Sequence, residues 1–215
     1  PVAFAADAEQ AAVVSDEEQK PTSGTCGEHV TWSLSEDGTL TISGTGEMED
    51  YSDDNESPWK SFYRQIKKVV IEQGVTSIGS CAFQSSRVLS TVEIPASVTK
   101  IAPDALNDCW DLSTITVDTE NEKYVSEDNV LFNKDKTTLV FYATGKKDSS
   151  YIIPSSVSRI GKNAFAYTQE LLEITIPETV KTIEDDAFFS CDNLEIVTIS
   201  NGVEEIGSAA FFGCR

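Results

Sequence analysis

The chain has 215 residues, enough for one domain of ordinary size or two small ones. Its 36 acidic and 16 basic residues give a formal net charge of −20, which argues against nucleic acid and anionic lipid as partners. The single histidine, His29, argues against His-based catalysis or a His-rich metal site, and no apolar stretch is long enough to span a membrane.

The first 25 residues are rich in Ala, Glu, Asp, Gln and Ser, so we expect a flexible acidic leader over residues 1–25. Within it, Ala3-Phe4-Ala5 matches the small-x-small pattern of a signal-peptide cleavage site. The alternative is an arbitrary start of the chain, and the residues do not decide between the two.

Residues 26–65 are predicted to form an N-terminal cap, because the exposed end of a stacked repeat needs one. Residues 29–34 and 39–43 alternate between apolar and polar around Asp37-Gly38, which is typical of a β-hairpin. Ser57-Pro58-Trp59 then favours a short helix with Ser57 as its N-cap.

Residues 66–215 contain an internal repeat. The second apolar residue of each expected strand recurs at steps of 23, 23, 36, 23 and 23 residues, at Ile71, Ile94, Val117, Ile153, Ile176 and Ile199. Further columns of Val, Ile, Ala-Phe and Leu follow in the same register. One such unit cannot bury its apolar side alone, whereas stacked units form a continuous core.

The repeat therefore predicts an α/β leucine-rich repeat solenoid dominated by β structure, since Leu89-x-x-Val92-x-Ile94 has the Leu-x-x-Leu-x-Leu pattern. Each unit should contain one short strand, a second short extended segment, and one helical turn at Ala-Phe-x-x-Cys. The predicted parallel strands are centred near Val70, Glu93, Thr116, Ile152, Thr175 and Thr198.

One unit, residues 117–152, is 13 residues too long. Residues 129–132 and 138–142 flank Asn133-Lys-Asp-Lys, which predicts an inserted hairpin. The chain stops at Arg215 inside a repeat, so we expect the natural protein to continue.

The five cysteines form no Cys-x-x-Cys pair, so a zinc site is not expected. Cys109, Cys191 and Cys214 share a repeat column with Ser86 and Thr168, which indicates small buried core residues that stay reduced. Cys26 and Cys81 lie outside that column, and a disulfide between them is left open for an extracellular protein.

No catalytic, cofactor-binding or metal-binding residue is assigned, and we expect a protein that is not an enzyme and needs no cofactor. The acidic segment Asp50, Asp53, Asp54 and Glu56 lacks calcium-loop spacing and is interpreted as a solvated loop. The aromatic residues Trp110, Tyr124 and Tyr142 are candidates for a sugar-stacking platform, with burial in the core as the alternative.

Side chains alternate along a strand, so the residue between two inward apolar positions points outward. These outward residues are predicted to form one continuous ladder and are the candidate ligand-binding residues: Glu93, Thr116, Ile152, Thr175 and Thr198. The alternative is that Thr simply suits an exposed strand.

The recurring pattern Ile-Pro-x-x-Val-x-x-Ile-x-x-x-Ala-Phe-x-x-Cys-x-x-Leu resembles the BspA-like leucine-rich repeat family of bacterial surface proteins over residues 66–215. Residues 26–59 are similar to the cap that precedes such repeats. The resemblance implies an extracellular, secreted or surface-attached adhesin that binds host matrix or cell-surface proteins. The alternative is a carbohydrate-binding or spacer module of a larger secreted enzyme. The resemblance predicts neither the oligomeric state nor the mode of anchoring.

Overall fold

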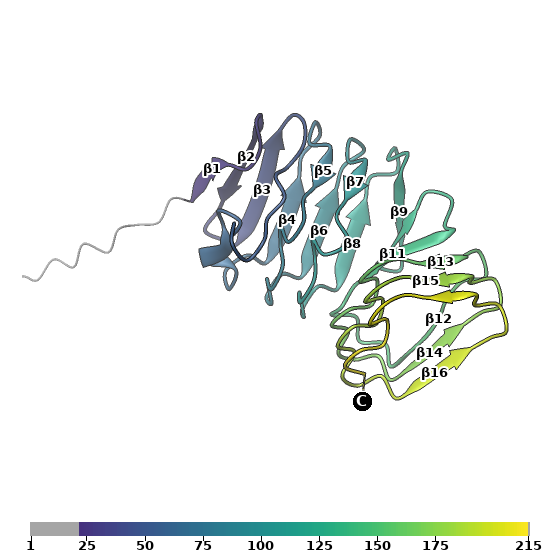
Figure 1. The fold of residues 1–215 in the computed structure, drawn as a ribbon. Helices are drawn as coiled ribbons and strands as arrows, with labels where there is room; N and C mark the ends of the chain where they lie inside the picture. The colour runs from purple at the N-terminus through teal and green to yellow at the C-terminus, as the bar shows by residue number, and fades with distance from the viewer. Residues whose placement is uncertain (1–21, 215) are drawn as a thin grey trace, which may run out of the picture.

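The computed structural model describes residues 22–214, so Ala3-Phe4-Ala5 and most of the expected leader lie outside the described residues. The chain within that range is almost entirely short strands joined by turns (Figure 1). The last leader residues form strand β1 (Ser23–Thr25), which corrects the expectation of a leader extending to residue 25. Backbone pairing with β2 holds this edge strand, although its side chains are exposed.

The cap contains the expected hairpin, formed by β2 (Val30–Leu34) and β3 (Thr39–Gly44). Gly38 closes its turn with a φ of 89°, which favours glycine. The predicted helix is one turn of 3₁₀-helix, Lys60–Phe62. Its N-cap residue is Trp59, not Ser57, and no side chain caps it. The expected Ser57 cap is therefore wrong, because the helix begins two residues later than Pro58 suggested.

The cap does more than cover the end of the repeats, because β3 pairs in parallel with β4 and continues the main sheet. Trp59 stacks on Phe83 of the first repeat unit at 5.7 Å between ring centroids, and its Nε1 donates to the Ala82 carbonyl at 2.8 Å. The cap thus supplies both a strand and a core aromatic to the first unit.

The first stack of units has two rows of strands. Its long row is hydrogen-bonded in the order β1, β2, β3, β4 (Lys68–Ile71), β6 (Thr91–Ile94) and β8 (Thr114–Val117). Its short row pairs β5 (Ser77–Ile78) with β7 (Lys100–Ile101) in parallel. Both rows confirm the predicted solenoid of short parallel strands.

The second stack has the same two rows. One comprises β12 (Ser150–Ile152), β14 (Glu173–Ile176) and β16 (Ile196–Ile199) in parallel. The other runs in the order β17 (Glu205–Ile206), β15 (Thr182–Ile183), β13 (Arg159–Ile160), β11 (Thr138–Tyr142), β10 (Val130–Asn133) and β9 (Tyr124–Glu127). The antiparallel pair β10–β11 occupies the place where the sequence predicts a hairpin, and β9 adds a strand that the sequence analysis did not predict.

The Ala-Phe-x-x-Cys segments are hydrogen-bonded turns, so the expected helical turns are wrong. Residues with positive φ flank these segments and interrupt any right-handed helix. Those before the segment are Cys81, Asn163, Asp186 and Ala209, and those near its end are Ser85, Asp108, Tyr167 and Ser190. The aromatic N–H instead bonds to the next unit, as Phe165 N does to the Ala187 carbonyl at 2.7 Å.

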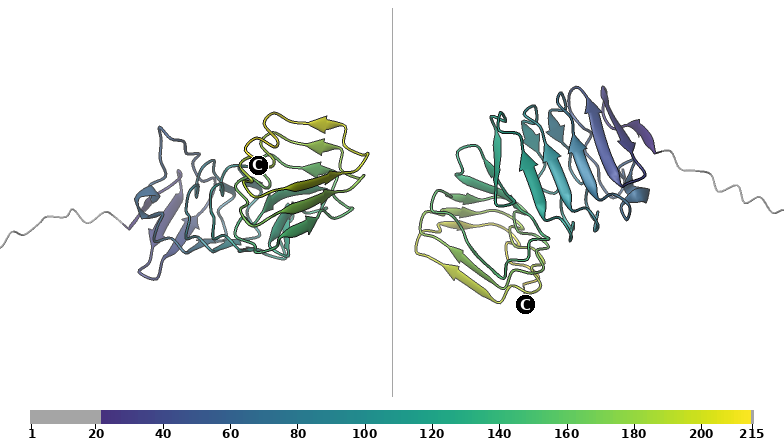
Figure 2. Two further views of the ribbon diagram at one scale, coloured as in Figure 1. Left: turned by 90° about the horizontal axis from the view of Figure 1, so that it is seen from below. Right: turned by 180° about the vertical axis from the view of Figure 1, so that it is seen from behind.

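The buried residues form two hydrophobic cores, one from Cys26 to Ala143 and one from Val130 to Ala210, which overlap in sequence at the long unit. Figures 1 and 2 show the strands of the second stack running in a different direction from those of the first. The solenoid therefore changes direction at residues 117–152.

Candidate ligand-binding face

The outward side chains of the first stack form a row across its main sheet. Val70 pairs with Glu93, and Glu93 pairs with Thr116, so the three side chains lie side by side on neighbouring strands. The residues just before them, such as Val92 and Ile115, are buried. This alternation places Glu93 and Thr116 on the outer face, as strand geometry requires.

The cap lengthens this row in a way the sequence analysis missed. Thr41 of β3 pairs with Val70, and Ser33 of β2 pairs with Thr41. The alternating pattern of residues 39–43 could have given the outward positions of β3, but nothing in it shows that β3 lies beside β4. The first outward row therefore runs through Ser33, Thr41, Val70, Glu93 and Thr116, and we call it the first strand row.

A shallow hollow of about 290 Å³ lies where β4, β6 and β8 end. The first strand row contributes Val70, Glu93 and Thr116 to its lining, and Pro95 and Asp118 lie at the strand ends. Two carboxylates and a hydroxyl therefore face the same hollow, which suits a basic or hydrogen-bonding side chain of a partner.

Glu93 is not an unpaired carboxylate. Its Oε1 lies 2.7 Å from Lys68 Nζ, and both side chains are about two-fifths exposed. An exposed pair of this kind contributes little to stability, so the pair can open to a ligand at small cost.

The second stack carries its own outward row, Ile152, Thr175 and Thr198, paired residue by residue on β12, β14 and β16. Ile152 is 73% exposed, and Ile196, which is also on the outer face of β16, is 51% exposed. We call Ile152, Thr175 and Thr198 the second strand row; Ile152 in the row and Ile196 beside it make this face apolar as well as polar.

The expected single ladder is wrong, because Thr116 and Ile152 lie on different sheets. The free edge of β8 is taken by side chains of the long unit: Ile115 N donates to Asn129 Oδ1 at 3.4 Å and Val117 N to Ser126 Oγ at 3.2 Å. With these N–H groups satisfied, β8 ends the first sheet, and the next strand in the repeat begins a new one.

The short row of the first stack ends in the same manner. Ile101 N donates to Tyr124 Oη at 3.2 Å, so a side chain again replaces the next strand. The buried Asn121 amide donates to the Pro95 and Val98 carbonyls at 2.8 and 3.0 Å and accepts from Lys123 N and Tyr124 N. Side chains of the long unit thus hydrogen-bond to the last strand of each row of the first stack, where the next strand would otherwise pair.

The cysteine column is structural. Cys109 Sγ donates to the Phe83 carbonyl at 3.2 Å, and Cys191 Sγ donates to the Phe165 carbonyl at 3.1 Å. Thr168 Oγ1, in the same column, donates instead to the Phe165 carbonyl of its own unit at 2.6 Å. Burial raises the pKa of the Cys109 thiol to about 12, which opposes thiolate chemistry there.

Cys26 and Cys81, the pair left open for a disulfide, are free thiols in the structure. Cys26 is buried in the cap, and its burial raises its pKa to about 12. Cys81 lies at a turn with φ of 52°, where its Sγ is 3.6 Å from Asp104 Oδ2. Each cysteine therefore has its own local environment.

The other sequence candidates do not come together as sites. Trp110 is 41% exposed, Tyr142 is fully buried, and Tyr124 is partly buried, so these three form no sugar platform. In the acidic loop, Asp50 Oδ1 accepts a hydrogen bond from Ser80 N at 2.8 Å. Within residues 22–214, no group of three or more His, Cys, Asp or Glu side chains is arranged to hold a metal ion.

Comparison with known proteins identifies the family. The family model described as the BspA type leucine rich repeat region matches residues 59–143 and 137–215 in six copies, so the chain belongs to that family. Its members are typical of bacterial surface proteins and protein-interaction modules, and their fold is a scaffold that is generally non-enzymatic. No curated protein matches the chain in sequence.

Two crystal structures show the same fold. A leucine-rich repeat protein from Eubacterium ventriosum is 27% identical with a TM-score of 0.55, over 90% of this chain and 70% of that one. A leucine rich cell surface protein from Faecalibacterium prausnitzii is 21% identical with a TM-score of 0.58, over 91% and 81% respectively. In the described part of this chain, no helix is long and apolar enough to cross a membrane.

Proposed function

We propose that this chain is a non-enzymatic extracellular binding module, secreted or attached to a bacterial surface, which acts as an adhesin for a host matrix or cell-surface protein. The observation that carries this proposal is the composition of the two strand rows. Their members are Ser33, Thr41, Val70, Glu93 and Thr116 in the first row and Ile152, Thr175 and Thr198 in the second.

These rows contain hydroxyl, carboxylate and aliphatic side chains and no aromatic ring. A protein partner fits such a surface, because protein interfaces combine apolar contacts with hydrogen bonds, about one per 100–200 Å². A sugar would need exposed aromatic faces. Outside the strand rows, the exposed Phe212 and the partly exposed Phe189 of the second stack use a face of each ring to stack on one another, at 5.4 Å between centroids. The carbohydrate-binding alternative is therefore less well supported.

Charge favours a basic partner. The chain carries a net charge of −20, which speeds the approach of a positively charged surface. Added salt screens this attraction, so binding should weaken between about 0.05 and 0.5 M ionic strength.

The test is a binding assay of the chain against a panel of extracellular matrix proteins. The double variant Thr175→Arg, Thr198→Arg places two cations on the second strand row, and the single variant Thr116→Arg places one on the first. The matched control Ser155→Arg, Ser156→Arg adds two charges at exposed residues in the turn after β12. We expect loss of at least about tenfold in affinity from one strand-row variant and little change in the control. A ligand that binds all three variants like the parent chain would exclude the strand rows.

A further inference from the structure

A second hollow, of about 690 Å³, lies between the cap and the turn of the first repeat unit, and none of its lining residues belongs to a strand row. One wall is formed by Lys60, Tyr63 and Arg64 of the 3₁₀-helix and the residues after it. The other wall is the turn that carries Ser85, Arg87 and Val88. Its volume lies within the range of ligand pockets, about 300–1,000 Å³. We call it the cationic pocket.

The cationic pocket is lined by basic residues, although the chain as a whole is strongly acidic. Lys60, Arg64 and Arg87 all line it. Elsewhere cations are commonly paired, as Lys136 is with Glu127 at 2.7 Å and Arg159 with Glu184 at 2.6 Å. Over residues 22–214, the cationic pocket contains one ion pair, Arg87 with Asp108, at a long 3.4 Å. Lys60 and Arg64 have no carboxylate partner in the described part of the chain. Two of the three positive charges of the pocket can therefore pair with a ligand.

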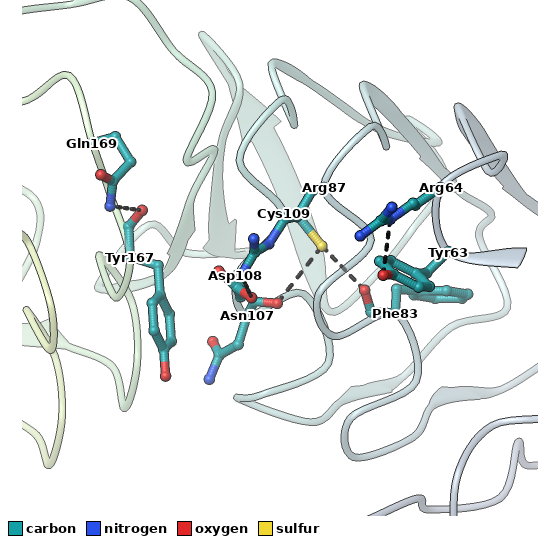
Figure 3. Close-up of polar contacts among 9 residues, drawn as sticks. All are labelled: Tyr63, Arg64, Phe83, Arg87, Asn107, Asp108, Cys109, Tyr167 and Gln169. Atoms are coloured by element: carbon teal, nitrogen blue, oxygen red, sulfur yellow. Dashed lines mark hydrogen bonds and ion pairs between the residues drawn. The ribbon is translucent and has the colours of Figure 1, made fainter. Parts of the chain in front are cut away.

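Both guanidinium groups are held in place by aromatic rings. The Arg87 guanidinium carbon lies 4.0 Å from the centroid of Trp110, and that of Arg64 lies 5.3 Å from Tyr63. Arg64 Nε also donates to Tyr63 Oη at 2.9 Å (Figure 3). Beyond the Arg64 Nε bond to Tyr63 and the Arg87 Nη2 pair with Asp108, the remaining guanidinium N–H groups can bind a planar carboxylate. The fixed position of each group lowers the entropy lost on binding.

From this geometry we infer that the cationic pocket binds an acidic peptide segment, with glutamate or aspartate side chains of the partner paired to Arg64 and Arg87. Carboxylates match the two-pronged donor arrangement of arginine, and charge-assisted bonds of this kind are about twice as strong as neutral ones. Lys60 supplies a third positive charge, and Val88 with the ring of Tyr63 gives an apolar wall for the peptide's aliphatic parts.

A sulfated or uronic-acid glycan fits this pocket less well. Sugar binding uses open aromatic faces, whereas a guanidinium group already lies over the rings of Tyr63 and Trp110. A long polyanion would also place many charges against a chain whose net charge is −20. A short peptide with two carboxylates, in contrast, places its negative charges only at the pocket and not against the rest of the acidic chain.

The test uses fluorescein-labelled peptides and the whole chain. The probe Gly-Ser-Glu-Ala-Glu-Gly-Ser is compared by fluorescence anisotropy with the same peptide carrying Gln at both Glu positions, and with a heparin-derived oligosaccharide. The variants are Arg64→Gln and Arg87→Gln. The matched control is Arg159→Gln, because Arg159 and Arg87 are almost equally exposed, at 51% and 52%, and Arg159 lies outside the pocket.

We expect the Glu peptide to bind at least about tenfold more tightly than the Gln peptide, and each pocket variant to weaken it by about tenfold. Arg159→Gln should bind like the parent chain. Equal binding of the Glu and Gln peptides, or an equal loss with Arg159→Gln, would overturn the inference. Arginine-dependent binding of the oligosaccharide without binding of the Glu peptide would also overturn it. The strand-row variants of the matrix assay leave this pocket intact, so the two proposals fail independently.

Discussion

Tyr142 stacks on Phe165 with 5.0 Å between ring centroids and 26° between ring planes. Its N–H bonds to the Ala164 carbonyl at 2.7 Å, as the N–H of Phe165 bonds to Ala187. Tyr142 therefore takes the core aromatic position of the long unit, and it lies 23 residues before Phe165, in the register of the second stack. The aromatic column of the second stack begins at Tyr142 and continues through Phe165, Phe188 and Phe211.

Phe188 lies inside this column and should be important for stability. It is fully buried and stacks on Phe165 at 4.8 Å and on Phe211 at 4.9 Å. Phe188→Ala should lower the free energy of unfolding by about 3–5 kcal/mol, because a large cavity opens between units. Urea denaturation measures the change. Phe212→Ala is the control, since Phe212 is 65% exposed, and an equal effect of both substitutions would contradict a buried column.

The parts of the fold that follow the period could be predicted from the sequence. Val92 and Ile94 alternate with polar residues and recur every 23 residues, so strand, register and inward face follow from one rule. The same rule gives the short row, because Ile78 and Ile101 occupy one column and pair in the structure. The stacked cysteine column follows likewise, although its thiol hydrogen bonds to backbone carbonyls do not.

Contacts that occur in only one unit could not be predicted from the sequence. The division between the two strand rows depends on Ser126 and Asn129 reaching the backbone of β8, and no pattern in the sequence marks those bonds. The turns found in place of the expected helical turns do have a signal in the sequence. Asn163 and Asp186 precede Ala-Phe in their units, and Asn and Asp are the non-glycine residues that most readily adopt positive φ.

Asn121 should hold the end of the first stack. Its buried amide makes four hydrogen bonds, two of them to backbone carbonyls of the preceding unit. Asn121→Ala should lower the free energy of unfolding by about 2–4 kcal/mol, because it leaves several buried polar groups without partners. Asn193→Ala is the control, because the exposed Asn193 makes one such bond, to the Gln169 carbonyl. A thermal midpoint that falls no further for Asn121→Ala than for Asn193→Ala would speak against this role.

The three cysteines of the repeat column should differ in reactivity. The neighbouring Cys191 thiol lowers the pKa of the partly exposed Cys214 to about 7. The interaction with Cys214 and burial raise the pKa of Cys191, and burial raises the pKa of Cys109 to about 12. The thiolate is the reactive form, so Cys214 should react first with a disulfide reagent.

The rate at Cys214 should rise about tenfold per pH unit below pH 7 and level off above it, because the thiolate fraction does so. Cys109 and Cys191 should react only after unfolding. Peptide mass spectrometry after timed labelling identifies the modified residues. Equal labelling of Cys109 and Cys214 in the folded chain, or a Cys191–Cys214 disulfide in unreduced protein, would count against this assignment.

Lys146 should fix the junction between the two stacks. Its side chain is only 6% exposed, and its Nζ lies 2.8 Å from Asp128 Oδ2 and 3.2 Å from Asp148 Oδ2. It also donates to the Asp128 carbonyl, so one ammonium group ties together the turn before β10 and the segment after β11. Without it, two carboxylates would face each other at the bend.

Lys146→Met keeps the apolar part of the side chain and removes the charge, and it should lower the free energy of unfolding by about 1–3 kcal/mol. Both carboxylates stay partly hydrated, which keeps the cost below that of breaking a fully buried pair. The next residue gives a matched control: Lys147 is 76% exposed and pairs with Glu170 at the surface, so Lys147→Met should have a much smaller effect. Urea denaturation of the two variants separates these cases, and equal midpoint shifts would show that Lys146 contributes no more than a surface lysine.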